Sequence, residues 1–170
     1  MGSRHRLSIG VDFGTTFSGS LTIVGFAFFT SQDLNIRDAE IVTSWPGNSA
    51  GYLEKVPSQI AYKIENEKLK ENTWGYAIPR GAKRHCWAKL LLDGNARITQ
   101  FDDPKLGGAG WPALPLPKGK VAGDVVADYL TFLYEYCMEY LSKRITDQVL
   151  RITPIDFWFT CPAIWLVLFL

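Results

Sequence analysis

The first fifty residues contain a strand pattern in which apolar and polar positions alternate. Residues 7–13 (LSIGVDF) alternate and predict a strand with one buried face. Residues 21–30 (LTIVGFAFFT) are β-branched and aromatic and predict a second, well-buried strand, antiparallel to the first across a tight turn at residues 14–16. Residues 40–44 (EIVTS) predict a third short strand, which ends at the turn residues WPGN. Short connections between the three strands favour a meander.

The clearest element is a helix predicted over residues 121–144. Apolar residues recur there every three or four positions on more than one side, so the helix is expected to be buried broadly. Asp124 near its start and Lys143 and Arg144 near its end suit the helix dipole. Residues 156–161 (DFWFTC) then predict a strand that enters a sheet.

The middle of the chain is expected to carry smaller elements. Residues 55–64 (KVPSQIAYKI) and 73–78 (TWGYAI) flank a charged turn and predict a hairpin. Residues 79–93 have apolar positions at roughly helical spacing and predict a short helix. Residues 102–120 contain four prolines and four glycines and predict a loop.

Composition narrows the class of protein. The chain has 170 residues, which suits one domain, and 47% of them are hydrophobic, which favours a folded core. The formal net charge is only +1, without the excess of basic residues that nucleic-acid binding requires, so no nucleic-acid partner is expected. The three cysteines and two histidines lack zinc-ligand spacing and do not indicate a disulfide framework. The apolar run at 164–170 is shorter than the roughly 20 residues of a membrane span. A cytoplasmic protein with no membrane partner is therefore expected.

One short stretch, DFGTT at residues 12–16, carries candidate chemistry. Phosphate groups need backbone N–H donors at close range, and a magnesium ion needs oxygen ligands for its water shell. Gly14 permits a tight turn near an anion, Thr15 and Thr16 offer amides and hydroxyls, and Asp12 can hold hydrated Mg²⁺. The same residues are also ordinary hairpin-turn chemistry. From these residues alone both interpretations remain open.

Several motifs in register resemble one family. IGVDFGTTFSG (9–19) resembles the first phosphate motif of the actin-like ATPases, and specifically that of the heat-shock-seventy chaperones. Further resemblances follow in the same order: KVPSQIAY (55–62), WGYAI (74–78), WAKLLLD (87–93), VADYLTFLYEYCMEYL (126–141) and FTCPAIW (159–165). The sequence looks most like the divergent fungal members.

The resemblance implies a fold and a division of the chain. It implies an α/β, ribonuclease H-like fold of the actin-like ATPase type, incomplete here, with a β-β-β meander followed by a helix and a strand. A partial ATPase domain would cover 7–165. Its lower, phosphate-binding lobe would comprise 7–50 and 145–165, its small upper lobe 51–120, and residues 121–144 would be the linking helix. Residues 166–170 depart from the family pattern as a tail.

The resemblance also implies ligands and roles. ATP or ADP with Mg²⁺ would be the cofactors, bound weakly or not at all by this fragment. Asp12 would serve Mg²⁺ through water, and Gly14, Thr15 and Thr16 would hold the β- and γ-phosphates. Phe17 stands where many members have tyrosine. A co-chaperone or nucleotide exchange factor is the partner implied besides nucleotide.

Departures from the family pattern limit the implied activity. The catalytic lysine of the upper lobe would align with Pro79, so Arg80 and Lys83 are only weak candidates for its role. The family's second phosphate loop and adenosine loops have no counterpart in this sequence. We therefore expect an ATP-binding fragment of a chaperone ATPase domain that does not hydrolyse ATP. A non-enzymatic interaction module is the alternative function. A truncated gene model or splice product without independent function is the other alternative.

Overall fold

The computed structural model describes residues 6–13, 23–30, 39–86, 88–89, 92 and 116–160. Within these residues the chain forms a mixed sheet, a small two-stranded sheet and two α-helices. None of the helices in this part of the chain is both long enough and apolar enough to cross a membrane.

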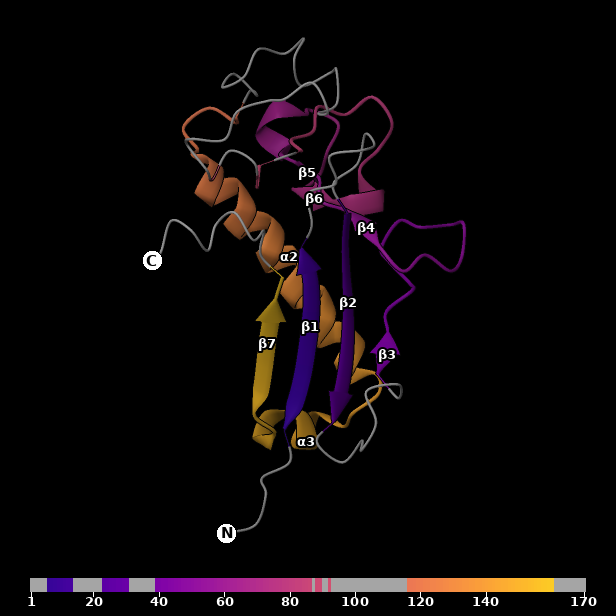
Figure 1. Ribbon diagram of the computed structural model, residues 1–170. Coiled ribbons are helices and arrows are strands. Elements are labelled where there is room, and N and C mark those ends of the chain that lie inside the picture. The colour runs from indigo at the N-terminus through magenta and orange to yellow at the C-terminus, as the bar shows by residue number, and fades with distance from the viewer. Residues whose placement is uncertain are drawn as a thin grey trace, which may run out of the picture.

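The main sheet is built around its first strand, β1 (Leu7–Phe13). On one side β1 pairs antiparallel with β2 (Ile23–Thr30), and on the other it pairs parallel with β7 (Ile155–Phe159). Two short strands, β3 (Glu40–Ile41) and β4 (Val56–Pro57), both pair antiparallel with β2. Figure 1 shows β7, β1, β2 and β3 side by side in this order. The predicted meander and the α/β class are confirmed, although the third strand, predicted at 40–44, is only Glu40–Ile41. The strand predicted at 156–161 is found at Ile155–Phe159. The actin-like form of the fold stays a prediction.

The alternation of residue types in β1 separates the two faces of the sheet. The side chains at every second position are buried: Leu7, Ile9, Val11 and Phe13. Gly10 and Asp12, between them, are exposed on the opposite face. The sheet therefore has one apolar face for a helix and leaves Asp12 on the other side.

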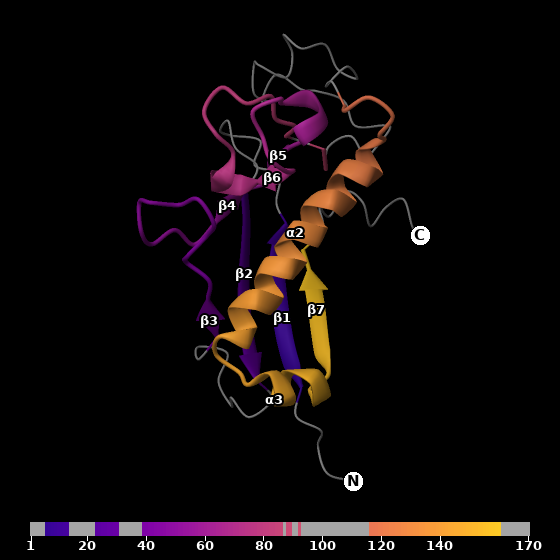
Figure 2. The same ribbon diagram turned by 180° about the vertical axis from the view of Figure 1, so that it is seen from behind.

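The long helix α2 (Ala122–Ser142) covers the apolar face. In Figure 2 it crosses the sheet diagonally, from the end near β4 to the end near the short helix α3 (Asp147–Ile152). The Asp124 carboxylate accepts a hydrogen bond of 2.9 Å from the Val121 N–H and so occupies a donor at the helix start. The helix predicted at 121–144 is confirmed, although it begins one residue later and ends two residues earlier than predicted. Its buried side chains are Ala122, Val125, Tyr129, Leu133, Cys137, Tyr140 and Leu141.

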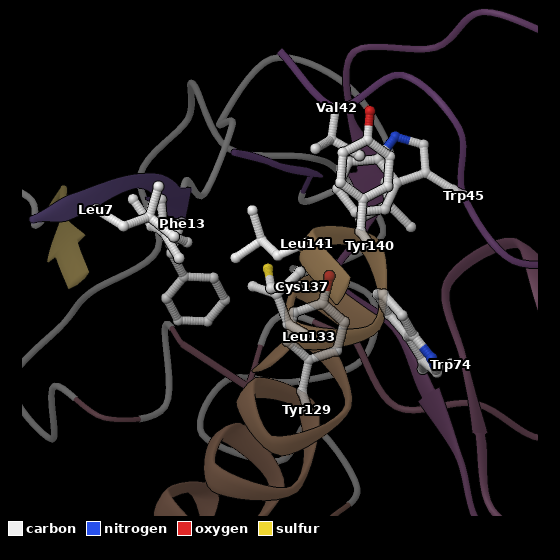
Figure 3. Packing of buried hydrophobic residues seen from close by; sticks show 13 residues of the cluster. Leu7, Phe13, Val42, Trp45, Trp74, Tyr129, Leu133, Cys137, Tyr140 and Leu141 are labelled. Carbon is white, nitrogen blue, oxygen red and sulfur yellow. The ribbon is translucent and has the colours of Figure 1, made fainter. Parts of the chain in front are cut away.

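Aromatic rings fill the core between α2 and the segments that follow β3 (Figure 3). The Trp74 ring meets the Trp45 ring edge-on, with 6.4 Å between centroids, and the Tyr129 ring edge-on at 5.7 Å. Tyr136 lies 6.0 Å from Trp74 and 5.5 Å from Trp45. Edge-to-face pairs of this kind add to the gain from apolar burial. Trp74 thereby packs the small hairpin onto the long helix.

The small hairpin consists of β5 (Ile60–Ala61) and β6 (Thr73–Trp74). A 3-10 turn follows each strand: η2 (Lys63–Glu65) begins one residue after β5, and η3 (Gly75–Ala77) begins directly after β6. Two residues pair on each side. The hairpin predicted from residues 55–64 and 73–78 is confirmed, with a shorter ladder than the alternation suggests.

The helix predicted at 79–93 is wrong for residues 79–86, whereas residues 87, 90, 91 and 93 lie outside the described residues. No α-helix forms in the described residues of 79–93. Pro79 and Gly81 turn the chain, and Gly81 has a φ of +80°. His85 then exchanges backbone hydrogen bonds of 2.8 and 3.1 Å with Ile60. Those bonds occupy the groups that a helix would use. The helix α3 lies in a segment for which no element was predicted. Of the proline-rich loop predicted at 102–120, only residues 116–120 are described, and they are not helical.

The two ends of the described chain meet at the sheet. Leu7 pairs with Ile155 and Val11 with Phe159, and the Arg6 guanidinium binds both carboxylate oxygens of Asp156 at 2.7 and 2.5 Å. Bidentate pairing of this kind fixes the geometry of the two side chains. The register of β7 against β1 is thus marked by a specific polar contact as well as by the backbone ladder.

Candidate functional site

The candidate site lies where β1 ends, beside the small hairpin (Figure 1). β1 and β7 are parallel and both end here, so their carboxyl ends lie together. Ligands of α/β proteins commonly bind at the carboxyl ends of parallel strands. Asp12, the penultimate residue of β1, stands on the face of the sheet opposite α2.

Among the described residues, the Asp12 carboxylate has one hydrogen-bond partner on each oxygen. Thr160, directly after β7, donates its hydroxyl to Oδ1 at 2.9 Å. Lys55, directly before β4, places its Nζ 3.0 Å from Oδ2. Partial burial raises the pKa of the Asp12 carboxyl, but the bonds from Lys55 and Thr160 and the charge of Lys89 outweigh it and hold the pKa below its ordinary value. The side chain is half exposed, so Asp12 presents an ionised carboxylate to solvent.

A second lysine approaches the same strand end from the interior. Lys89 is buried, its Nζ donates a hydrogen bond to the Phe13 carbonyl oxygen, and it lies 4.6 Å from the centroid of the Phe13 ring. A cation over an aromatic face is stabilised by the ring quadrupole. Two positive charges therefore flank the last two residues of β1, Lys55 on the solvent side and Lys89 on the core side.

Gly14, Thr15, Thr16 and Phe17, expected to bind phosphate, lie outside the described residues. Their clustering with Asp12 stays a prediction. The strands on either side are described, and Phe13 pairs with Val24, so β1 and β2 run antiparallel as predicted. Asp12 is the one predicted phosphate or metal residue that lies within the described residues, and it stands at the end of β1.

Lys55, Lys89 and Thr160 were not predicted as site residues. Each belongs to a motif that supports the family resemblance, but no chemical role follows from its local sequence. What places Lys55 and Thr160 at Asp12 is pairing between distant segments: β4 with β2, and β7 with β1. The one local signal for Lys55 is its position as the first residue of the segment 55–64, which was predicted to form one side of the hairpin.

Lys83 and Arg80, the two candidates for the role of the family's catalytic lysine, do not contact Asp12. Lys83 instead binds the Glu65 carboxylate, whose other oxygen lies 2.5 Å from Nε2 of buried His85. Arg80 is exposed in the turn after η3. The Lys83–Glu65–His85 cluster is therefore described best as a polar anchor of the small hairpin.

This anchor makes stability depend on pH. Burial raises the pKa of Glu65, but the bonds from Lys83 and His85 outweigh it, so the net pKa lies below the ordinary 4.5. A carboxyl whose folded-state pKa is depressed stabilises the fold above its unfolded pKa, and this contribution is lost as pH falls through the folded pKa. We expect Glu65→Gln to lower the free energy of unfolding at pH 7 by about 1–3 kcal/mol. The variant should then lose less stability than the wild type between pH 5 and pH 3.

Urea denaturation at a series of pH values measures this effect. Glu71→Gln, which changes an exposed carboxylate in the same segment, is the matched control and should behave as the wild type does. Parallel acid profiles for Glu65→Gln and the wild type would show that the cluster does not contribute.

Among the described residues, two hollows adjoin the site, and neither is lined as a phosphate pocket would be. A cavity of about 10 Å³, room for about one water, lies beneath Phe13 and is lined in part by Ser58 and His85. An open groove of about 370 Å³ lies between α2 and the sheet. Its lining is nearly all apolar and includes Val11, Leu130, Leu133, Tyr134, Phe157 and Phe159.

The described residues contain no group of three or more histidine, cysteine, aspartate or glutamate side chains that could enclose a metal ion. A carboxylate that acts through water needs no such group, because the remaining ligands of Mg²⁺ are usually waters and phosphate oxygens. The exposed, ionised Asp12 fits that outer role. No protein-family model, curated protein or solved structure matches the chain.

Proposed function

We propose that the chain binds the phosphate groups of ATP or ADP, together with Mg²⁺, at the carboxyl end of β1. The observation that carries the proposal is the Asp12 carboxylate, which is ionised and half exposed at the end of two parallel strands. Lys55 and Lys89 add the positive charge that a polyphosphate needs. In this proposal Asp12 holds the metal through water, and Gly14, Thr15 and Thr16 contact the phosphates.

The wider proposal is an actin-like ATPase fold of the heat-shock-seventy type. The order of elements supports it: an N-terminal meander, a small excursion, a long helix on the apolar face, and a strand parallel to β1. A chaperone-related partner, such as an exchange factor, and a cytoplasmic location belong to the same proposal. The partner and the location rest on the resemblance of the sequence motifs to that family.

Titration calorimetry of the full chain with ATP or ADP in excess Mg²⁺ tests the binding proposal. We expect Asp12→Asn to weaken Mg-ATP binding by about 10- to 100-fold, the usual effect of removing a group that orients a metal through its outer shell. In EDTA the variant should bind ATP no more weakly than the wild type does, because the metal is absent and the substitution removes a negative charge beside the anion.

Glu135→Gln is the matched control for this substitution. It also removes one exposed carboxylate, but from α2 on the other face of the sheet, and it should leave Mg-ATP binding unchanged. Wild-type chain that shows no binding at millimolar nucleotide would contradict the proposal and favour the non-enzymatic interaction module.

A further inference from the structure

Lys55 occupies the side of Asp12 that an incoming cation would approach. Its Nζ lies 3.0 Å from Oδ2, while Thr160 holds Oδ1 from the end of β7. Both members of the ion pair are close to half exposed, at 42% for Lys55 and 50% for Asp12. Ion pairs this exposed are weak and exchange readily with solvent. The lysine is therefore a replaceable counterion of the carboxylate.

The backbone of Lys55 is fixed even though its amine is exposed. Its carbonyl oxygen accepts a hydrogen bond of 3.1 Å from the Tyr76 hydroxyl. The next residue, Val56, is buried and pairs with Val24 of β2. A flexible side chain on a fixed backbone can exchange one oxygen partner for another close by without moving the strands.

We infer that Lys55 couples cation binding to phosphate binding at Asp12, an inference that rests on the proposed function. Without phosphate, the ammonium of Lys55 neutralises Asp12 and repels a divalent cation. A polyphosphate attracts the same ammonium away from Oδ2, and the carboxylate then becomes available to the hydrated metal. The site accordingly favours the metal–polyphosphate complex over either ion alone.

The charges around Asp12 support this exchange. Lys89 is held by the Phe13 carbonyl and ring, so it stays at the core side of the strand end. When Lys55 moves to a phosphate, Asp12 loses its direct ion pair while both lysines remain near the bound anion. The net charge of Asp12, Lys55 and Lys89 is +1, which opposes a lone divalent cation and favours an anion.

Three substitutions and two probes test the inference. Lys55→Met removes the charge and keeps the length of the side chain, Lys55→Arg keeps the charge, and Lys143→Met is the matched control. Lys143 also pairs with an exposed carboxylate, Glu139, at 2.6 Å, but on α2. The probes are Mn²⁺ without phosphate, followed by electron paramagnetic resonance, and Mg-ATP, followed by calorimetry. Metal-free tripolyphosphate is the reference anion.

Lys55→Met should change the two affinities in opposite directions. We expect Mn²⁺ alone to bind about tenfold more tightly, because a unit charge beside the carboxylate is gone, and Mg-ATP to bind about tenfold more weakly. Lys55→Arg should restore both affinities toward the wild-type values. Lys143→Met should match the wild type. A lysine that merely packed would not produce changes of opposite sign.

Failure of the coupling and failure of the proposed function would give different results. If the wild type binds Mg-ATP and Lys55→Met binds both probes with unchanged affinity, the coupling is wrong and the proposed function stands. If Lys55→Met weakens Mn²⁺ and Mg-ATP together, Lys55 maintains the site and does not compete for it, and the inference is again wrong. If the wild type binds neither Mg-ATP nor tripolyphosphate, the proposed function is wrong and the inference falls with it.

Discussion

Replacing Trp74 with alanine is expected to lower the free energy of unfolding by about 3–5 kcal/mol, the usual range for truncating a buried aromatic side chain. Trp74 is 7% exposed and makes edge-on ring contacts with Trp45 and Tyr129. It comes from the small hairpin, whereas Tyr129 lies on α2, so the substitution opens a cavity where the hairpin meets the helix. Because a typical domain is stable by about 5–15 kcal/mol, this one change removes a large part of the total.

Urea denaturation followed by far-ultraviolet circular dichroism measures the loss without relying on tryptophan emission. Trp158→Ala is the matched control, because Trp158 is 67% exposed on β7. Its effect should stay within about 0.5 kcal/mol. Equal losses for the two variants would mean that the aromatic cluster of Figure 3 does not hold the hairpin to the helix.

Gly47→Ala is expected to lower the free energy of unfolding by about 2–4 kcal/mol, from a strained backbone and a steric clash together. Gly47 has a φ of +76°, and a Cβ there would lie 2.4 Å from the Cα of Ala77. Backbone atoms cannot move aside as the end of a flexible side chain can, so the turn after Trp45 would have to separate from η3.

Gly51 allows the two causes to be separated in a thermal or urea unfolding series. It has a similar φ of +90°, but a Cβ there meets nothing within 4 Å. Gly51→Ala should therefore cost only the backbone strain, about 1–2 kcal/mol. If Gly47→Ala costs no more than Gly51→Ala, the close packing of the turn against Ala77 is not present in solution.

The elements that the sequence predicted well are those whose periodicity reflects one large burial surface. Alternation over Leu7–Phe13 and the apolar stripe of Ala122–Ser142 both arise because β1 and α2 cover each other. In such elements every second or every third to fourth residue is apolar, and that spacing is visible in the sequence. Tertiary packing and local preference agree there.

The failures occur where a long-range contact overrides the local pattern. Residues 79–93 have helix-like spacing, yet His85 uses its backbone groups to bond Ile60 and joins the edge of the small hairpin. α3 is only six residues long and has no buried residue, so no apolar stripe indicated it. Short elements of this kind depend on their neighbours in space, which a local pattern does not show.

The residues of the candidate site also fall into those that the local sequence indicates and those that only the fold brings together. Asp12 was proposed from the sequence because a carboxylate near a strand end, followed by glycine and threonines, can serve phosphate and Mg²⁺, and its role stays a prediction. Lys55 and Thr160 were not, since they reach Asp12 from 43 and 148 residues away along the chain. Their roles depend on the pairing of β4 and β7, and no local motif encodes that pairing.

The pairing of β1 with β7 has a consequence for the order in which the chain folds. Arg6 and Asp156 are 150 residues apart, and closing a loop of that length costs about 4 kcal/mol of chain entropy before any contact forms. At about 5–20 residues per second, a ribosome needs roughly 7–30 s to extend the chain from the end of β1 to the end of β7. Throughout that time one edge of β1 lacks its native partner, and open strand edges invite association with other chains. The nascent chain is thus expected to need shielding of β1 until β7 emerges, after which the central strand is paired on both sides.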